Sequence, residues 1–293
     1  MTNSTEPPLP IPPMFGPGSQ SDGPDGEKLD YMEMPREMAT FEMPIAPEPE
    51  DVIGMEAGKK KLEEIIVALR LYRFGKPCKV VELDDLPEGD LGLVNQILGE
   101  GEVSIVCGDK IQAQESVLAG VWRVLHFDDS GKRCRDTVEI GCYPDAINTE
   151  VFANAQQKVP KLDDTLPMNV FNAPSLFAEL EENQSKYKLG DMVHAINLSL
   201  LPHTEEDLAY LNNKLGVGNT VILSRGYGNC RVSSTNTKNI WWVQYYNSQD
   251  ALILNQLEVI NVPEVVGAAP EDIEDSTERL DKIMKLYRGV GNS

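Results

Sequence analysis

The sequence is poor in the residues that build metal and redox centres. It has only three histidines, far apart along the chain, and its five cysteines form no C-x-x-C pair: Cys78, Cys107, Cys134, Cys142 and Cys230. An odd, scattered set of cysteines argues against a disulfide framework and against a zinc or iron–sulfur site. No carboxylate pair and no catalytic triad stands out either. We therefore expect a protein without cofactor, metal site or catalytic residues, and not an enzyme.

Positive charge and long apolar runs are also scarce. Lys and Arg number 26 against 47 Asp and Glu, so the net charge is −21. This charge argues against partners such as nucleic acid or an anionic membrane surface, and it suits a soluble protein or one with a basic partner. No apolar run approaches the ~18 residues of a membrane helix. No Lys or Arg and no apolar segment typical of a secretory signal precedes Lys28. We expect a cytoplasmic protein without membrane insertion.

Two stretches of the chain match each other in order, residues 90–145 and residues 207–264. The matched pairs are Leu91/Leu208, Asn95/Asn212, Leu98/Leu215, Gly99/Gly216, Gly101/Gly218, Ser116/Ser234, Trp122/Trp241, Val124/Val243, Glu139/Glu258 and Pro144/Pro263. Their offset grows from 117 through 118 to 119, as two single-residue insertions would produce. This matching predicts one ancestral unit that was duplicated.

Apolar periodicity predicts an α+β fold in which each of two tandem related repeats is a helix followed by an antiparallel β-meander. In the first repeat we expect a helix over 91–98 with Asp90 as its cap, and strands over 102–107, 111–117, 121–127 and 137–142. In the second, Thr204 caps a helix that Gly216 ends, and strands follow over 220–224, 229–234, 240–247 and 251–260. Flanking helices are expected over 54–72, 148–155, 174–187 and 270–287.

Composition divides the chain into four segments. The start is rich in Pro, Met and acidic residues and cannot bury enough apolar surface to fold, which predicts a disordered tail. The segments are the tail (1–50), the first repeat with its leading helix (51–147), a linker with a helix (148–190), and the second repeat with its closing helix (191–293).

The densest polar cluster is the turn from Arg225 to Arg231, which carries two glycines in a Gly-Tyr-Gly element. It is not a phosphate loop, because no Gly-Lys-Ser/Thr follows and no helix opens after it. In the first repeat, Lys110 and Gln112 stand where Gly228 and Cys230 stand in the second, so we expect a functional site in the second repeat alone. A hairpin whose polar groups satisfy local hydrogen bonds is the alternative.

The aromatic strand after this turn adds a second group. Alternation places Trp241 and Tyr245 on one face and Trp242 and Tyr246 on the other. Because Trp241 matches Trp122, its face is expected to be core, which leaves the Trp242 face for a partner; burial of both faces is the alternative. The predicted partner-binding residues are Arg225, Tyr227, Asn229, Cys230, Arg231, Trp242 and Tyr246.

The runs Gly226-Tyr227-Gly228-Asn229-Cys230-Arg231, Trp242–Asn247, Ile253–Val259 and Val262–Glu264, with Met34–Met38 near the start, resemble the HupH/HyaF-type hydrogenase expression/formation proteins. The resemblance spans about residue 30 to the end. It implies a non-catalytic accessory protein of uptake [NiFe] hydrogenase that acts as a maturation chaperone. Its implied partner is the precursor of the iron–sulfur small subunit, bound before twin-arginine export, with other hydrogenase accessory proteins as further partners.

Two alternatives stay open beside this hypothesis. One is an iron–sulfur carrier or thiol-dependent assembly factor that uses Cys230, whose neighbours Arg225 and Arg231 supply positive charge. The other is a structural scaffold that holds accessory proteins through its N-terminal arm.

Overall fold

The computed structural model describes residues 46–226 and 228–288. The predicted disordered tail therefore lies, up to residue 45, outside the described residues. The helices are α1 (Glu56–Leu71), α2 (Glu88–Leu98), α3 (Asp145–Glu150), α4 (Ala173–Lys186), α5 (Glu205–Leu215) and α6 (Pro270–Arg288), with the 3-10 turns η1 (Leu198–Leu200) and η2 (Glu264–Val266). The strands are β1 (Lys79–Glu82), β2 (Val103–Cys107), β3 (Ile111–Glu115), β4 (Val121–Phe127), β5 (Arg133–Ile140), β6 (His194–Asn197), β7 (Val217–Ser224), β8 (Asn229–Thr235), β9 (Ile240–Tyr246) and β10 (Leu252–Val259).

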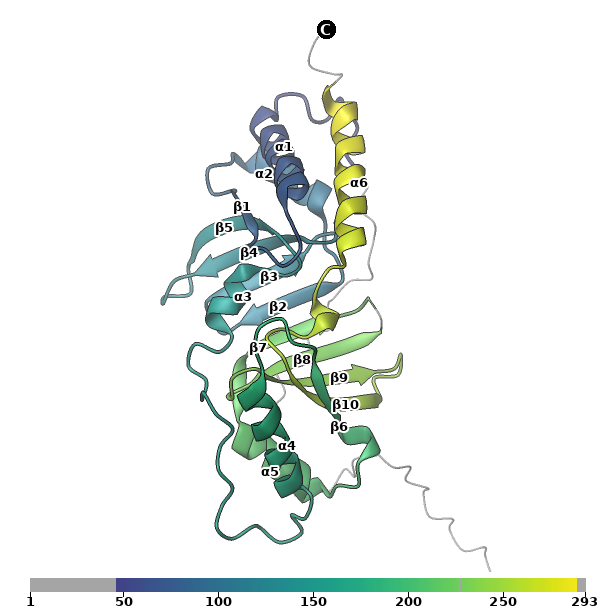
Figure 1. The fold of residues 1–293 in the computed structure, drawn as a ribbon. Helices are drawn as coiled ribbons and strands as arrows, with labels where there is room; N and C mark the ends of the chain where they lie inside the picture. Colours follow the sequence, from purple (N-terminus) through teal and green to yellow (C-terminus); the bar gives the residue numbers. More distant parts are fainter. Residues whose placement is uncertain (1–45, 227, 289–293) are drawn as a thin grey trace, which may run out of the picture. The chain divides into compact units, whose positions relative to one another are not determined.

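The strands form one sheet in the order β1-β5-β4-β3-β2-β7-β8-β9-β10-β6 (Figure 1). Every neighbouring pair is antiparallel, including β2 with β7, where the two halves of the chain meet. The predicted α+β class with an antiparallel sheet is therefore confirmed. The predicted strands fall within a few residues of the observed ones, because their apolar residues alternate.

One face of the sheet, which we call the tryptophan face, carries a core that runs through both halves. Trp122, Val124, Trp241 and Val243 are fully buried on it. The short helix α3 and the turn η2 cover this face with Ile147 and Val266, among others. Phe152, which follows α3, packs its ring edge-on against Trp241 with 5.3 Å between ring centroids. The first half thus covers the second half's tryptophan.

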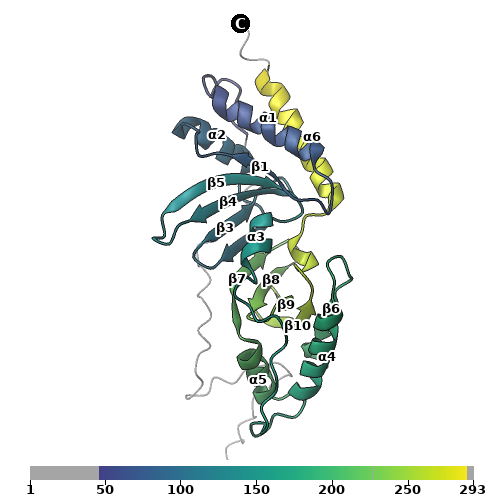
Figure 2. The same cartoon turned by 60° about the vertical axis from the view of Figure 1, so that its left-hand side comes forward.

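The opposite face, which we call the helix face, is covered by two groups of helices. Helices α1, α2 and α6 pack on the β1-β5-β4 end and share a core with Val81 and Val138. Helices α4 and α5 pack on the other end and share a core with Ile240 and Leu257. Figures 1 and 2 show the two groups at opposite ends of the sheet. The predicted apolar stripe of α1 is buried in the first of these cores: Leu62, Ile65, Ile66 and Leu69.

The two halves carry the same succession of elements, and matched residues hold matched places. Trp122 lies opposite Glu139 in the β4–β5 register, as Trp241 lies opposite Glu258 in the β9–β10 register. A Cβ on Gly101 would lie 2.3 Å from the Ser116 carbonyl oxygen, and one on Gly218 would lie 2.2 Å from Ser234 Oγ. Both positions therefore need glycine because a neighbouring strand passes too close for a side chain.

Helices α1 and α4 each begin with backbone N–H groups that donate to an aspartate on the next helix in the chain. Asp207 Oδ1 accepts the backbone N–H groups of Phe171, Asn172 and Ala173, each at 2.9 Å. Its side chain also completes the capping box that Thr204 begins, so the predicted cap at Thr204 is confirmed. In the first half, Asp90 Oδ1 accepts the N–H of Gly58 at 2.6 Å.

The prediction that Asp90 caps its own helix is wrong. Helix α2 begins after Pro87 without a side-chain cap. Asp90 lies inside the helix, and its carboxylate instead accepts the free Gly58 amide in the first turn of α1. The short helix predicted over 148–155 forms earlier, at α3, where Glu139 accepts the N–H of Asp145.

Two flanking helices pack differently from the sequence expectation. Helix α4, expected in the linker over 148–190, buries Leu176, Phe177 and Leu180 in the core beside α5. Helix α6, expected to close the second repeat, packs on α1 instead, where Arg288 pairs with Glu63 at 2.7 Å. Residue periodicity shows which side of a helix is apolar but not which partner covers it. The other segment boundaries stay predictions.

We predict that Asp207→Asn destabilises the protein by about 2 kcal/mol at pH 7, because an amide cannot accept all the hydrogen bonds that the carboxylate accepts. Burial raises the pKa of Asp207, but the backbone hydrogen bonds from Ala173, Thr204 and Asn172 outweigh burial and hold the pKa below the usual range of an aspartate. This stabilisation is therefore complete above about pH 4 and is lost as the pH falls through the folded-state pKa. Urea unfolding at pH 7 and near pH 3 measures it; a difference between wild type and variant that does not shrink at acid pH contradicts the assignment.

Candidate functional site

The predicted site residues lie on β8, on β9 and in the turn before β8. The β8–β9 register pairs Asn229 with Tyr246 and Arg231 with Gln244, whereas Cys230 pairs with Tyr245. Residues directly opposite each other in an antiparallel pair share a face. Asn229, Arg231, Trp242 and Tyr246 therefore share the helix face, and Cys230 lies on the tryptophan face.

Most of the predicted residues reach the surface. Arg225 and Asn229 are exposed, and Arg231, Trp242 and Tyr246 are half-buried. The Trp242 ring packs against the core under α4 and α5, and its Nε1–H donates to Asn255 Oδ1. Packing and this hydrogen bond thus fix the Trp242 side chain, and only part of it reaches the surface. Tyr227 lies outside the described residues.

Cys230 departs from the prediction. Its side chain is 4% exposed and packs in the core of the tryptophan face. Burial raises the pKa of the Cys230 thiol to about 12, although a hydrogen bond with Tyr245 acts in the opposite direction. A thiol that stays protonated at neutral pH is a poor nucleophile and metal ligand. Strand alternation causes this burial, since Asn229 and Arg231 on either side face the other way.

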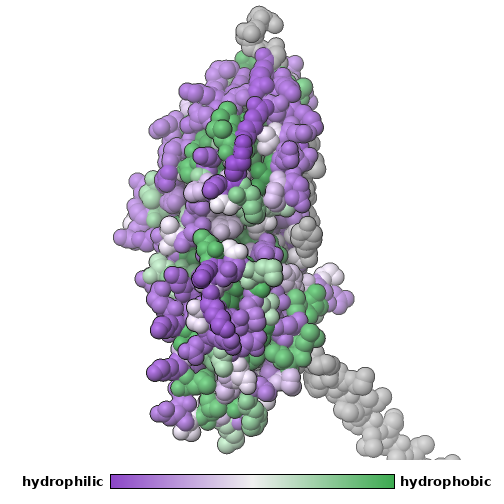
Figure 3. All heavy atoms as spheres, in the orientation of Figure 1, coloured by the Kyte–Doolittle hydropathy of each residue, from purple (hydrophilic) through white to green (hydrophobic). Residues whose placement is uncertain are grey.

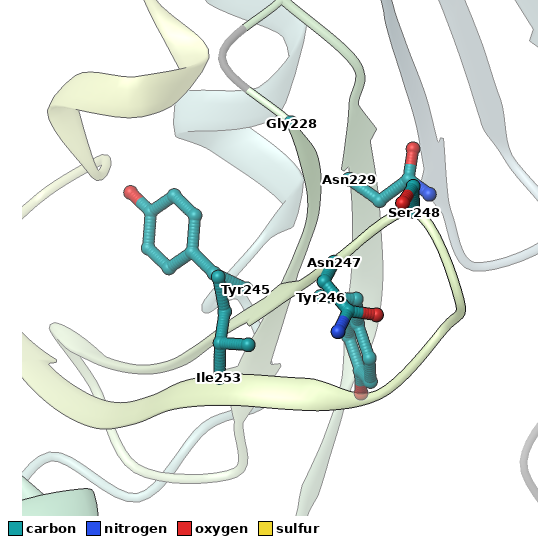
Figure 4. A pocket seen from close by; sticks show the side chains of 7 residues that line it. All are labelled: Gly228, Asn229, Tyr245, Tyr246, Asn247, Ser248 and Ile253. Atoms are coloured by element: carbon teal, nitrogen blue, oxygen red, sulfur yellow. The ribbon is translucent and has the colours of Figure 1, made fainter.

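A half-open pocket of about 410 Å³ lies beside these residues, at the ends of β8, β9 and β10. It is lined by Gly228, Asn229, Tyr245, Tyr246, Asn247, Ser248 and Ile253. Figure 4 shows Tyr245 and Tyr246 pointing away from each other on β9, with Ile253 on the neighbouring strand β10. Asn229 and Tyr246 were predicted from the sequence, whereas Ile253 was missed, because an apolar residue in a strand usually reads as core.

Residues 46–226 and 228–288 contain neither a metal-binding cluster nor a membrane-spanning helix. No group of three or more His, Cys, Asp or Glu residues in this part of the chain lies close enough together to hold a metal ion. Among the helices described, none has the length and apolar character needed to cross a membrane.

The chain was compared with known protein families. The sequence model of the HupH hydrogenase expression protein, C-terminal conserved region, matches residues 55–166 and 170–287. The chain belongs to this family. The resemblance found in the sequence is therefore confirmed, and the motifs at Gly226–Arg231 and Trp242–Asn247 lie within the matched segments.

Curated relatives in the HupH family span most of the chain. Hydrogenase expression/formation protein HupQ of Azotobacter chroococcum mcd 1 is 45% identical over 277 residues, which cover 93% of this chain and 96% of the relative. Hydrogenase expression/formation protein HupH of Rhodobacter capsulatus is 41% identical, and the match covers 95% of this chain and 98% of the relative. Hydrogenase-1 operon protein HyaF of Escherichia coli (strain K12) is 31% identical, and the match covers 69% of this chain and 71% of the relative.

Among solved structures, the hydrogenase expression protein HupH from Thiobacillus denitrificans ATCC 25259 is 29% identical to this chain. The match covers 39% of this chain and 95% of the chain in that structure, with a TM-score of 0.36.

We predict that iodoacetamide at pH 7 labels Cys134 rapidly and Cys230 only after unfolding. Cys134 is exposed, whereas Cys230 is buried and its pKa is raised to about 12. Mass spectrometry of labelled peptides, with and without urea, measures the two rates, and Cys134→Ser is the matched control. Rapid labelling of Cys230 in the folded protein would contradict its placement in the core.

Proposed function

We propose that this chain is a non-catalytic maturation factor for uptake [NiFe] hydrogenase that binds the precursor of the iron–sulfur small subunit before export, in the cytoplasm. The observation that carries the proposal is the near full-length similarity to proteins named for hydrogenase expression and formation. The names of these relatives mention hydrogenase but no subunit of it. The small-subunit precursor is the partner that the family resemblance implies.

The surface around β8 and β9 supports a protein-binding role. It combines the exposed Arg225 and Asn229 with the half-buried Arg231, Trp242 and Tyr246, and it borders the pocket. Arginine, tryptophan and tyrosine are the residues that most often dominate the binding energy of protein interfaces. We leave Cys230 out of the proposed contact surface because its side chain belongs to the core.

The burial of Cys230 also weighs against the alternative of an iron–sulfur carrier or thiol-dependent assembly factor. Such a factor needs an accessible thiolate, and both the 4% exposure and the raised pKa oppose one at Cys230. Arg231 does not face the thiol, since it lies on the opposite face of β8. The maturation factor is the proposal that agrees with the chemistry of the site.

We further infer that the two halves descend from one duplicated unit. Three observations support this inference: the family's sequence model matches both halves, the sheet order is symmetric about the β2–β7 pair, and the Trp–Glu pairs occupy equivalent places. On this inference the first half kept the scaffold, while the aromatic surface arose in the second, where Trp242 replaces the equivalent of Arg123.

We predict that the double variant Arg231→Ala, Trp242→Ala captures the small-subunit precursor with at least about tenfold lower affinity than wild type. The measurement is biolayer interferometry with purified precursor, after thermal unfolding has shown that the variant remains folded.

The matched control is Arg135→Ala, Val80→Ala, which removes an arginine and an exposed apolar side chain at the β1 end of the sheet. The control should bind as wild type does. Equal affinity of wild type and the Arg231, Trp242 variant would remove this surface from the proposal, and absence of binding by wild type would remove the partner.

A further inference from the structure

Strand β10 is paired along only half of its outer side. Strand β6 pairs with Gln256–Val259, whereas β10 begins at Leu252. Beyond Asn197 the chain turns into η1, and the Ser199 hydroxyl accepts the Asn255 N–H at 2.8 Å, where a strand would have supplied a carbonyl. Within the part of the chain that the structure describes, residues 252–254 have no strand beside them on this side.

This open edge is apolar. It reads Ala251-Leu252-Ile253-Leu254, and Leu252 and Ile253 are 44% and 61% exposed. Leu200 of η1 adds a side chain that is 80% exposed. Figure 3 shows hydrophobic residues gathered on the side of the surface where β6 and β10 lie in Figure 1, although hydrophilic residues dominate that view.

The sheet's other end shows how an edge is normally protected. Strand β1 carries the charged, exposed residues Lys79 and Glu82, and Glu82 pairs with Arg135. Charged side chains on an edge strand discourage pairing with another chain. The edge at Leu252–Leu254 has no such charge, and exposed apolar surface of this kind marks an interaction site.

A β-bulge lies within this edge segment. The β9–β10 register pairs Leu252 with Tyr246 and Leu254 with Tyr245, so Ile253 is an extra residue in a β-bulge. Ile253 also lines the pocket together with Tyr245 and Tyr246 (Figure 4). The open edge and the pocket therefore share Ile253.

We propose that Leu252–Leu254 is the docking edge for an extended, apolar segment of the partner protein, which adds to β10 as a further strand. Backbone hydrogen bonds along the edge supply affinity, and the pocket beside Ile253 selects the side chain that enters it. A strand is the occupant because a strand edge presents a row of backbone donors and acceptors that a helix cannot satisfy. The partner's identity rests on the proposed function, in which it is the small-subunit precursor.

The test compares the affinity of two Ile253 variants for purified small-subunit precursor. Ile253→Pro removes a backbone donor at a bulged edge position, where proline is compatible with the fold, and Ile253→Lys adds a charge that opposes strand addition. Each should raise the Kd at least about tenfold. Leu286→Lys is the matched control, since Leu286 on α6 is also 61% exposed; it should leave the Kd unchanged.

The outcomes separate the docking edge from the proposed function. If wild type binds the precursor and both folded Ile253 variants bind equally well, the docking edge is wrong and the function stands. If wild type does not bind the precursor, the proposed function fails, and with it the named partner. Should Ile253→Pro not fold, Ile253→Lys decides alone. A wild-type dimer that Ile253→Lys converts to a monomer in light scattering would show that a second copy occupies the edge, which also overturns the proposal.

Discussion

The pairing of β2 with β7 is the contact on which the rest of the structure depends. Five residue pairs, from Val103–Ser224 to Cys107–Thr220, join the halves through backbone hydrogen bonds. Because the pair lies at the centre of the sheet, the tryptophan faces of both halves become one core. The Cys107 thiol lies 2.9 Å from the Thr220 hydroxyl, so the small polar groups at this junction are satisfied locally.

Burial also sets the protonation of several acids and thiols beside the sheet. Burial raises the pKa of Glu139 and of Glu258 behind the two tryptophans. Burial likewise raises the pKa of Cys78 to about 12 and that of Cys142 to about 11, with neighbouring carboxylates adding to the shift. A net charge of −21 strengthens this tendency, because a thiolate near carboxylates is disfavoured. Cys107 and Cys230 therefore act as small core residues.

Local patterns predicted much of the fold because they are local. Alternation located the strands and separated Trp241, fully buried, from Trp242, half-buried, and Thr204 marked the start of α5. Asp90 was misjudged because its partner, the Gly58 amide, lies 32 residues away. The packing of α4 and α6 was missed for the same reason: an apolar stripe does not identify the surface that covers it.

The candidate site also has features that local patterns predict and one feature that they do not. Asn229, Arg231 and Tyr246 could be found from composition and alternation, and alternation also set Cys230 on the face opposite Arg231. The open edge at Leu252–Leu254 could not be found, since it exists only because β6 ends at Asn197 and pairs no further. Where a strand stops relative to its neighbour is a long-range property of the pairing, which residue preferences do not record.

The segment that follows each half's last strand crosses to the other half. Val159 and Val170 pack in the core of α4 and α5, and Asp163 lies 2.5 Å from Lys214. Helix α6 in turn packs on α1. During synthesis on the ribosome, α2 and the strands of the first half can pack on α1 early, but the side of α1 that α6 covers stays exposed for nearly 200 residues, from Leu71 to Pro270. The core of the first half is thus completed only once α6 has been synthesised, and a chain truncated before Pro270 would lack one of the helices that cover α1.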